Sequence, residues 1–536
     1  MRIKFLCLIL ISICLVSVRC GMYPPPSPIS KLGPTIRIGI AERLESLALE
    51  SNDAIDIWDQ NDQLIAQNVY GKKWQVKLVD TEPVTLLYRL FYREVNNPET
   101  AQQLVETLAD RGIPATIKQV KKKIFRGRIY GPVISYQVFL KPIFESEEDA
   151  TEYQRSISEK ISTTPLPFYQ TRPGGKIILI NQESNQQFES PGLIRVQGHQ
   201  FAFRVRVGEG FHFENEEVRR YKDQLEFWID RYGKLTVVNV LPIEEYLKGV
   251  VGSEMHPKFP LEALKSQAVA ARSYTLARLD KQHRLEPFDV CDEVHCHVYG
   301  GIDHEAPEVN EAVSATLGKV VMSNDRICDT FYASVCGGHS ENNENVWNSD
   351  PQPYLRGGLD SRLARQFPDD YLTDESNIRK WIESSPDVYC NPALQEFPEA
   401  LNYTKKYFRW KIQYTKDELT RIIFNKTNEK IGSLIEIIPV KRGVSGRLMK
   451  IKLRGTSKTI SIDGELAIRK ALSTNYLYSS CFVVDREGSD FIIKGAGWGH
   501  GVGMCQTGAA IMALRGSAYE QILNHYYPNS EIIKLY

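Results

Sequence analysis

The most restrictive feature of this sequence is a glycine-rich run near its carboxyl end. Residues 495–510 read GAGWGHGVGMCQTGAA, with glycine at every second position from 495 to 503. The run matches neither the GxGxxG nor the GxxxxGK[ST] order of phosphate-binding loops. Alternating glycine instead favours a close backbone approach around one side chain, His500. A purely structural glycine-rich turn is the alternative.

Composition limits the class of protein. The chain has 536 residues, with 66 basic and 66 acidic side chains and 42% hydrophobic residues. This length predicts about three domains. The balanced charge argues against a dedicated nucleic-acid binder, which usually carries a basic excess. The ordinary hydrophobic content excludes bulk disorder and a polytopic membrane protein.

The first residues predict export. Residues 1–20 combine a short basic start with an uncharged, mostly apolar run from Phe5 to Val18, the length of a signal-peptide core. An uncleaved anchor is the alternative. Cys20 would allow a lipid anchor of the bacterial lipoprotein type, although Arg19 fits that cleavage site badly. A proline-rich linker, 21–34, follows. Seven cysteines remain after residue 20, an odd number.

The rest of the chain predicts an α+β fold. Residues 35–80 indicate a β segment, because apolar and polar residues alternate. Residues 84–162 predict a β-α-β unit and then a β-α unit, a small βαβ-type module. It resembles a SPOR-type domain, a family that binds peptidoglycan glycan stripped of its peptides. Residues 185–536 indicate one large β-rich region with inserted helices.

Glu254 is the leading candidate for a catalytic residue. It ends an apolar stretch in LPIEEYLKGVVGSEMHP, residues 241–257. Apolar surroundings raise the pKa of a carboxyl group, which a general acid needs near neutral pH. Taken alone, such a residue is more often a surface glutamate. Glu341, after the Gly-Gly turn of YASVCGGHSE, is the second candidate.

A helix is predicted to follow Glu254, from Pro260 to Leu279, and it carries Arg272. A partly buried arginine needs an anionic partner. Glu254 is one candidate partner, but a guanidinium beside it would lower its pKa and spoil a general acid. We therefore expect Arg272 to bind a substrate carboxylate. A structural ion pair is the alternative.

The third segment with chemical potential, residues 283–301, is dense in cysteine and histidine. Two cysteines and three histidines within fifteen residues suit the four-ligand coordination of zinc, although the spacing is not that of a standard zinc finger. A disulfide between Cys291 and Cys296, or reduced cysteines without a ligand, are the alternatives.

Taken together and in this order, these segments resemble the SpoIID/LytB family, which includes stage II sporulation protein D and the amidase enhancer. The resemblance covers roughly 185–536, with the early strands as a weaker extension. Four motifs carry it: LPIEEYLKGVVGSEMHP leading into ALKSQAVAARSY, VHCHVYGG, YASVCGGHSE and GWGHGVGMCQTGAAIMA.

The resemblance implies a lytic transglycosylase that acts on denuded peptidoglycan glycan in the bacterial cell envelope. It places the catalytic acid at Glu254 and the helix arginine at Arg272. Some members hold a structural zinc, which here implies Cys291, His295 and Cys296, with His283 as the chosen fourth ligand and His297 as its rival. Further substrate-binding residues are expected in the matching segments, at Gln267, Tyr274, His500 and Gln506.

Two other functions remain open at this stage. One is a non-catalytic glycan-binding enhancer of a cell-wall amidase, as LytB-type members are described. The other is a structural envelope protein in which the SPOR-like module carries the function.

Overall fold

The computed structural model describes residues 33–536 except for short stretches at 127–128, 170, 172, 209–213, 280–281, 294, 348, 363–367, 369 and 395. The predicted signal peptide (1–20), Cys20 and nearly all of the linker (21–34) therefore lie outside the described residues. Helices and strands both occur throughout the rest, so the α+β prediction is confirmed. Within the described ranges, no helix is both long enough and apolar enough to cross a bilayer.

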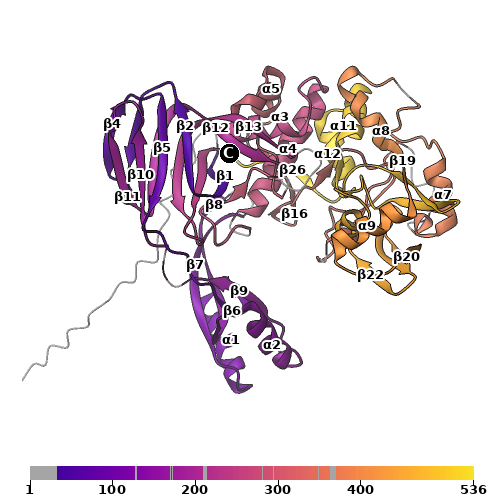
Figure 1. Ribbon diagram of the computed structural model, residues 1–536, viewed down its shortest axis with the longest axis horizontal. Coiled ribbons are helices and arrows are strands. Elements are labelled where there is room, and N and C mark those ends of the chain that lie inside the picture. Colours follow the sequence, from indigo (N-terminus) through magenta and orange to yellow (C-terminus); the bar gives the residue numbers. More distant parts are fainter. Residues whose placement is uncertain are drawn as a thin grey trace, which may run out of the picture.

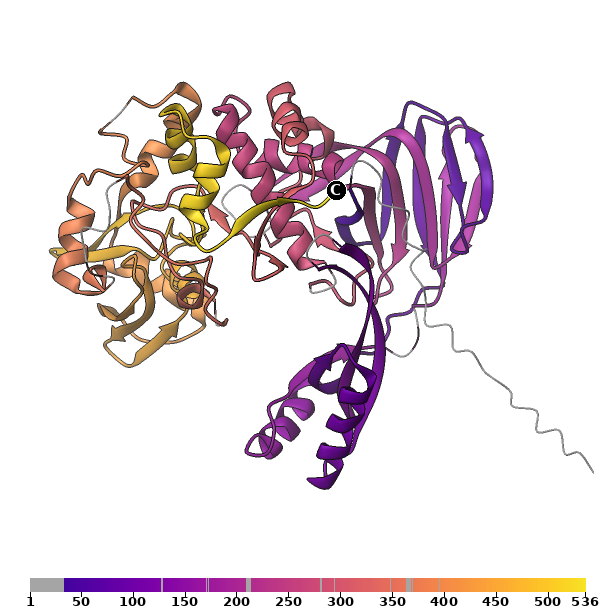
Figure 2. The ribbon, with the colours of Figure 1, turned by 180° about the vertical axis from the view of Figure 1, so that it is seen from behind.

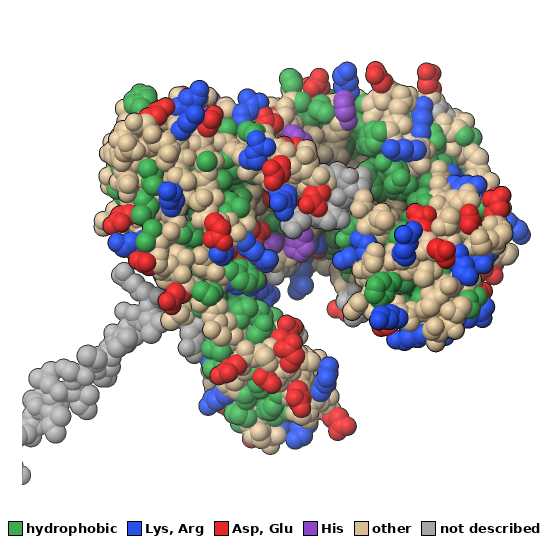
Figure 3. All heavy atoms as spheres, viewed as in Figure 1, with side chains coloured by type: hydrophobic (Ala, Val, Ile, Leu, Met, Phe, Trp, Pro, Cys, Tyr) green, Lys and Arg blue, Asp and Glu red, His purple; other side chains and the backbone are tan. Residues whose placement is uncertain are grey.

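The molecule is elongated, with a small module projecting from its side (Figure 1). A β-rich wall stands at one end, a group of helices occupies the middle, and a mixed lobe lies at the other end. Figure 2 shows the same order from behind. Basic and acidic side chains are interspersed over the visible face, in keeping with the balanced composition (Figure 3).

The wall is one eleven-stranded sheet. Along its main path the order is β11-β10-β5-β2-β12-β13-β14-β1-β15, while β3 pairs with β12 and β4. Alternate residues such as Ile36, Ile38 and Ile40 are buried, as the sequence pattern predicts. The strands are β1 (Thr35–Leu44), β2 (Ser46–Ser51), β3 (Ile55–Trp58), β4 (Leu64–Val69), β5 (Lys73–Val79), β10 (Lys176–Asn181), β11 (Gln187–Pro191), β12 (Leu193–Val207), β13 (Asn215–Ile229), β14 (Leu235–Pro242) and β15 (Val290–Cys291).

This sheet joins segments that the sequence analysis treated as separate units. Strands from the 35–80 segment pair with strands that precede and follow residue 185; for example, β1 pairs with β14 and β5 pairs with β10. The early strands and the large region therefore share one core. Sequence periodicity could not show this, because it reports a strand but not its partner.

The projecting module is inserted between β5 and β10. Its four strands are antiparallel in the order β7-β8-β6-β9, with two helices packed on the sheet. The β-α-β-β-α-β order is that of ferredoxin-like folds. Its elements are β6 (Leu87–Val95), α1 (Pro98–Asp110), β7 (Ala115–Arg126), β8 (Ile129–Phe144), α2 (Glu147–Ile157) and β9 (Thr164–Phe168). The first five lie where the sequence predicts them, and β9 was not predicted.

The central group of helices is built around one helix, α4. Helix α4 (Leu261–Arg278) is surrounded on nearly all sides by α3 (Ile243–Glu254), α5 (Pro307–Ala315), α11 (Gln506–Leu514) and α12 (Tyr519–Tyr526). A small sheet lies beside these helices. Its strand order is β17 (Arg326–Ile327), β16 (Lys319–Ser323) and β26 (Glu531–Lys534).

The far lobe has a second hydrophobic core of its own, built within residues 410–493. Two short strands, β18 (Tyr332–Ala333) and β25 (Met504–Cys505), pair in parallel where this lobe meets the central helices. Its other elements are α6 (Asn343–Val346), α7 (Glu375–Glu383), α8 (Lys405–Phe408), β19 (Arg409–Tyr414), α9 (Lys416–Thr427), β20 (Leu434–Arg442), β21 (Leu448–Gly455), β22 (Thr459–Asp463), α10 (Glu465–Ala471), β23 (Phe482–Glu487) and β24 (Asp490–Ala496).

Candidate functional site

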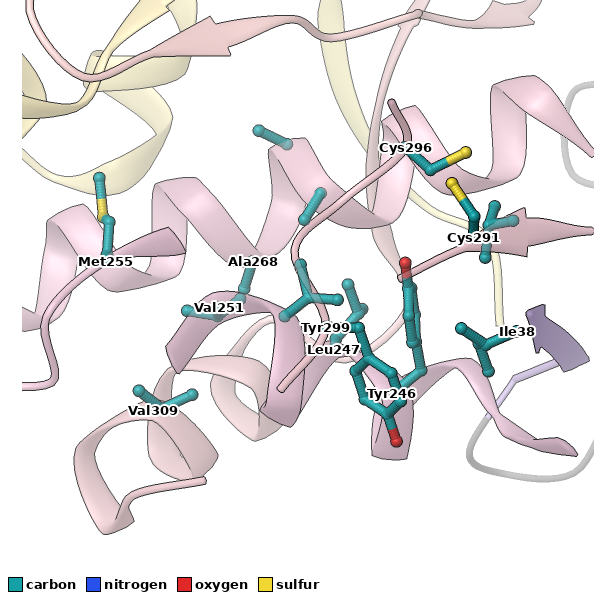
Figure 4. Packing of buried hydrophobic residues seen from close by; sticks show 14 of the residues in the cluster. Ile38, Tyr246, Leu247, Val251, Met255, Ala268, Cys291, Cys296, Tyr299 and Val309 are labelled. Carbon is teal, nitrogen blue, oxygen red and sulfur yellow. The ribbon is translucent and has the colours of Figure 1, made fainter. Parts of the chain in front are cut away.

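Glu254 is the last residue of α3, and the packing of that helix fixes its position. Tyr246, Leu247 and Val251 bury one face of α3 against the central core (Figure 4). The opposite face lies tightly against the following chain, because a Cβ on Gly252 would come within 1.8 Å of the His304 carbonyl oxygen. Glycine at 252 thus allows the close approach that holds the end of the helix.

The side chain of Glu254 is only partly exposed. Its Oε1 accepts one hydrogen bond, from the Val298 N–H at 3.2 Å. Burial raises the pKa of Glu254 from 4.5 to about 7, while Val298, Tyr332 and Gln506 oppose this shift more weakly. No second carboxylate is among the groups that shift this pKa in the described part of the chain. The group can therefore be protonated near neutral pH, as a general acid requires.

Two of the predicted substrate-binding residues lie behind Glu254. The side-chain amide of Gln506 donates to the Glu254 backbone carbonyl at 3.2 Å and to Gln267 Oε1 at 3.3 Å. Both glutamines are buried, Gln267 completely. They link α3, α4 and α11 and position Glu254, which differs from the expected direct contact with substrate.

Aromatic side chains continue the site beyond Tyr332. Phe331 and Trp347 stack with ring centroids 4.1 Å apart, and His500 lies 5.0 Å from Trp347. All three are partly exposed. Burial lowers the pKa of His500 to about 3, so its ring is neutral, and its Nδ1 accepts the Val502 N–H at 3.0 Å. Tyr274 packs against Phe331 at 5.7 Å, with the Arg278 guanidinium over its ring.

The glycine-rich run brings His500 to this place. Gly497, Gly499, Gly501 and Gly503 all have positive φ, a conformation that glycine adopts without strain. A Cβ on Gly503 would meet the Phe331 carbonyl oxygen at 2.0 Å. The predicted close backbone approach around His500 is thus present in the structure.

Arg272 differs from its prediction. It is completely buried, and it forms a bidentate ion pair with Glu244, at 2.8 Å from Nε and 2.7 Å from Nη2. Its remaining donors point to the carbonyls of Lys319 and Val313. The structure therefore corrects the expected role of Arg272: the side chain is fully buried and paired with Glu244, out of reach of a substrate carboxylate. The structural ion pair, the stated alternative, is the observed arrangement.

The cysteine and histidine segment forms a compact four-residue group, which we call the loop cluster: His283, Cys291, His295 and Cys296. One nitrogen or sulfur from each lies within 4.8 Å of the others. His283 Nε2 is 3.3 Å from Cys296 Sγ, and His295 Nδ1 is 3.7 Å from Cys291 Sγ. The two sulfur atoms point toward one another (Figure 4). Two imidazoles and two thiols form a donor set that zinc binds in tetrahedral sites.

Two of the alternatives for this segment, His297 as a ligand and a disulfide, do not occur among the described residues. His297 lies outside the loop cluster; its ring is buried between Tyr246 and Tyr332, and burial lowers its pKa to about 3. Cys291 and Cys296 are not joined in a disulfide. His283 is thus the fourth member of the group, as chosen from the sequence.

The carboxylate of Glu341, the second catalytic candidate, is already occupied by hydrogen bonds within the protein. It is 1% exposed and accepts hydrogen bonds from the N–H groups of Asn342, Val444 and Ser445, the Asn345 amide and the Ser445 hydroxyl. A carboxylate satisfied by five donors is a structural anchor. It joins the turn after β18 to the hairpin between β20 and β21.

Sequence reasoning missed three contributors to the site. Glu244 pairs with Arg272, 28 residues later in the chain, and the Val298 N–H donates to Glu254, 44 residues earlier. Tyr332 stood in a noted motif, but nothing in the sequence marks it as the neighbour of Glu254. The adjacency of Phe331 and Tyr332 to the Gly-Gly turn was the available signal.

Comparison with known proteins gives two matching family models. Residues 231–322, a range that contains Glu254 and the loop cluster, match the model described as Stage II sporulation protein. Residues 341–503 match a domain of unknown function (DUF8618).

Several curated proteins are similar over slightly more than half of the chain. An uncharacterised protein of Brachyspira hyodysenteriae is 32% identical over 299 residues, which cover 56% of this chain and 68% of that protein. The amidase enhancer of Bacillus subtilis is 28% identical over 53% of this chain and 40% of its own length. Stage II sporulation protein D of Bacillus subtilis is 26% identical over 55% of this chain and 75% of its own length.

Proposed function

The chain belongs to the SpoIID/LytB family, and we propose that it is an exported lytic transglycosylase that cleaves MurNAc–GlcNAc bonds of denuded peptidoglycan. One observation carries this proposal: the partly buried Glu254 carboxyl, whose pKa desolvation raises to about 7, with no carboxylate among the described groups that shift it. Hydrolytic glycosidases normally use two carboxylates. A lytic enzyme needs one, because the sugar supplies its own nucleophile.

The proposed reaction uses Glu254 twice. The protonated carboxyl first gives its proton to the glycosidic oxygen as the bond from that oxygen to MurNAc C1 breaks. The resulting carboxylate then accepts the proton of the MurNAc 6-hydroxyl as its oxygen bonds to C1. The products are a 1,6-anhydro end and a free 4-hydroxyl, and no water is consumed. The Val298 N–H stabilises the intermediate carboxylate.

The partly exposed rings of Phe331, Trp347 and His500 supply a surface for sugar rings beside Glu254. Aromatic faces offer a large, rigid contact area at low entropic cost. We assign substrate stacking to this group, and His500 keeps its predicted role. Tyr274 supports it from behind through Phe331.

The loop cluster fits a structural zinc, held by His283, Cys291, His295 and Cys296. A bound zinc would supply a rigid four-point crosslink. Val298, whose N–H reaches Glu254, stands two residues after Cys296. The loop cluster would therefore fix the donor that faces the catalytic carboxyl.

The deciding experiment is mass spectrometry of denuded glycan strands incubated with the protein. We expect 1,6-anhydro ends with wild type and a loss of about 10²–10⁴-fold with Glu254→Gln, the range for one general acid–base group. Glu341→Gln is the matched control, since it makes the same carboxyl-to-amide change in a saturated site; it should cleave normally per folded molecule. Reducing ends without the mass loss of water would identify a hydrolase and overturn the mechanism.

The second candidate is a non-catalytic enhancer of a cell-wall amidase. The similarity to the protein named amidase enhancer favours it. In this case Glu254→Gln would still stimulate an amidase on intact cell wall, and neither protein would cleave denuded glycan. Loss of both stimulation and cleavage in the variant would support the enzyme.

We further propose that the protein works in the bacterial cell envelope and that the SPOR-like module binds glycan there. The predicted signal at 1–20 and the names of the relatives support this location. Deleting the whole inserted module, residues 84–168, should weaken retention on denuded cell wall and leave cleavage of short, soluble strands intact.

A further inference from the structure

A second group of metal-type ligands lies apart from the loop cluster, and nothing in the proposed mechanism uses it. It consists of Cys336, Asp360, Cys390 and Cys505, which we call the buried cluster. One ligand atom from each lies within 4.8 Å of the others. All four residues are at most 3% exposed. They come from positions up to 169 apart, so only the tertiary fold brings them together.

The distances between these atoms suit a tetrahedral metal site. Cys336 Sγ lies 3.6 Å from Cys390 Sγ and 3.1 Å from Asp360 Oδ2. Ligands held 2.3 Å from zinc at tetrahedral angles are about 3.8 Å apart. A disulfide would require sulfur atoms about 2.05 Å apart. The spacing between Cys336 and Cys390 therefore resembles shared coordination more than a covalent bond.

Backbone N–H groups point at the sulfur atoms. Gly338 N–H donates to Cys336 Sγ at 3.3 Å, while the N–H groups of Cys336 and Gly508 donate to Cys505 Sγ at 3.2 and 3.3 Å. Cys505 is also the N-cap of α11. N–H donors and a helix N-terminus both favour a thiolate, the form of cysteine that binds metals.

Asp360 has the outer contacts of a metal-binding carboxylate. The hydroxyl of Tyr526 donates to its Oδ1 at 2.8 Å, and His525 Nε2 lies 3.3 Å away. Ligating carboxylates are held in this way by a second layer of partners. Burying a carboxylate against three thiols is costly unless cations face it, and a bound metal ion would add to the partner that His525 supplies.

Two arginines, the buried Arg447 and the partly exposed Arg409, lie where they can moderate the negative charge of such a site. Arg447 donates to the Cys336 carbonyl at 3.1 Å, and Arg409 donates to the Gly337 carbonyl at 3.0 Å. Three thiolates, one carboxylate and a divalent cation would carry a net charge of about −2. The two guanidinium groups that contact residues 336–337 would offset this negative charge.

We propose that Cys336, Asp360, Cys390 and Cys505 bind a structural zinc ion. The site fastens the segment that carries Asp360 and Cys390 to the paired strands β18 and β25. It lies directly beside the catalytic region, because Gln506, which follows Cys505, holds the Glu254 carbonyl. The inference is independent of the reaction proposed for Glu254.

The test is the zinc content of the purified chain, isolated without added reductant or chelator and measured by mass spectrometry. With both clusters filled, we expect about two zinc ions per wild-type chain and about one after Cys390→Ser or after Cys291→Ser. Cys328→Ser is the control, since Cys328 is a buried cysteine outside both clusters; it should retain the wild-type content. An unchanged content in Cys390→Ser would overturn the proposal.

A second measurement uses wild type alone, in case Cys390→Ser does not fold. The protein is denatured with chelator and without reductant, alkylated, digested and mapped. We expect Cys336, Cys390 and Cys505 all to be alkylated, since metal-bound thiolates become free. A crosslinked pair of peptides containing Cys336 and Cys390 would show a disulfide instead and would overturn the metal site.

Discussion

The two ends of α3 place the same residue type in opposite electrostatic environments. At the first turn, Glu244 is 1% exposed and meets the Arg272 guanidinium, the Gly318 N–H and the Tyr536 hydroxyl. At the last turn, the Glu254 carboxyl has the Val298 N–H and no cationic partner among the groups that shift its pKa. The helix dipole favours an anion at the first position and disfavours it at the second.

The comparison shows that burial alone does not determine what a carboxylate does. With a guanidinium beside it, a buried glutamate is held in an ion pair and anchors structure. Without one, it takes up a proton near neutral pH and becomes a candidate acid. Ten residues on one helix are enough to separate these outcomes.

The largest effect is expected from breaking the ion pair between Glu244 and Arg272 at the first turn of α3. Arg272→Met leaves Glu244 buried without its cation, and removing one partner of a buried ion pair costs about 3–5 kcal/mol. Urea unfolding should show this loss of stability, and the double variant Glu244→Gln/Arg272→Met should recover part of it. The KM of the folded fraction should not change. A raised KM with native stability would restore Arg272 as a substrate ligand.

The next effect concerns the unpaired end. Below pH 4.5 the Glu254 carboxyl is neutral in both the folded and the unfolded chain, but between pH 4.5 and 7 only the unfolded chain ionises. Wild type therefore loses stability as pH rises through this window. Glu254→Gln avoids the loss, so it should be more stable than wild type at pH 8, by about 3 kcal/mol at most, and equal to it at pH 4.

Thermal unfolding of both proteins at the two pH values measures this difference. Glu341→Gln serves as the comparison, because it removes a carboxylate that five donors satisfy and should destabilise the protein at pH 8. Equal stability of wild type and Glu254→Gln at both pH values would mean that the Glu254 pKa is ordinary.

A smaller effect is expected in the pH dependence of cleavage. The acid form of Glu254 must be present at the start of the reaction, so kcat/KM should fall about tenfold per pH unit above about 7. Initial rates on denuded glycan between pH 5 and 9 would show the decline. A profile that remains flat through pH 9 would exclude Glu254 as the acid.

The smallest effect comes from Tyr332→Phe. The Tyr332 side chain lowers the pKa of Glu254 slightly, against the larger effect of burial. Removing its hydroxyl should shift the decline in kcat/KM to higher pH, while the Phe ring keeps its stacking on His297. A shift to lower pH would show that the Tyr332 hydroxyl does not lower the pKa of Glu254.

The local parts of this comparison could be predicted from the sequence. Apolar periodicity predicts α4, and the apolar residues before Glu254 predict its raised pKa, whereas the helix α3 itself was not predicted. The loop cluster was also foreseen, since its four members lie within fourteen residues of one another. Each of these features depends on neighbours in the chain.

The parts that failed depend on contacts between distant segments. The partner of Arg272 is 28 residues away, on a different helix, and nothing in the sequence marks Glu244 as that partner. The buried cluster could not be seen, because its cysteines are single residues in separate motifs. The pairing of β1 with β14 joins residues about 200 positions apart, and no periodicity encodes a register of that kind.

The way the small module enters the wall has a consequence for how such a protein can change over time. The chain leaves the sheet at the end of β5 and returns at the start of β10, and these strands pair directly, Val79 opposite Lys176. The module has its own core, so its gain, loss or exchange would leave every strand of the wall in register. The rest of the chain can thus keep its fold with a different inserted module, and a short β-turn is sufficient to close the gap when none is present.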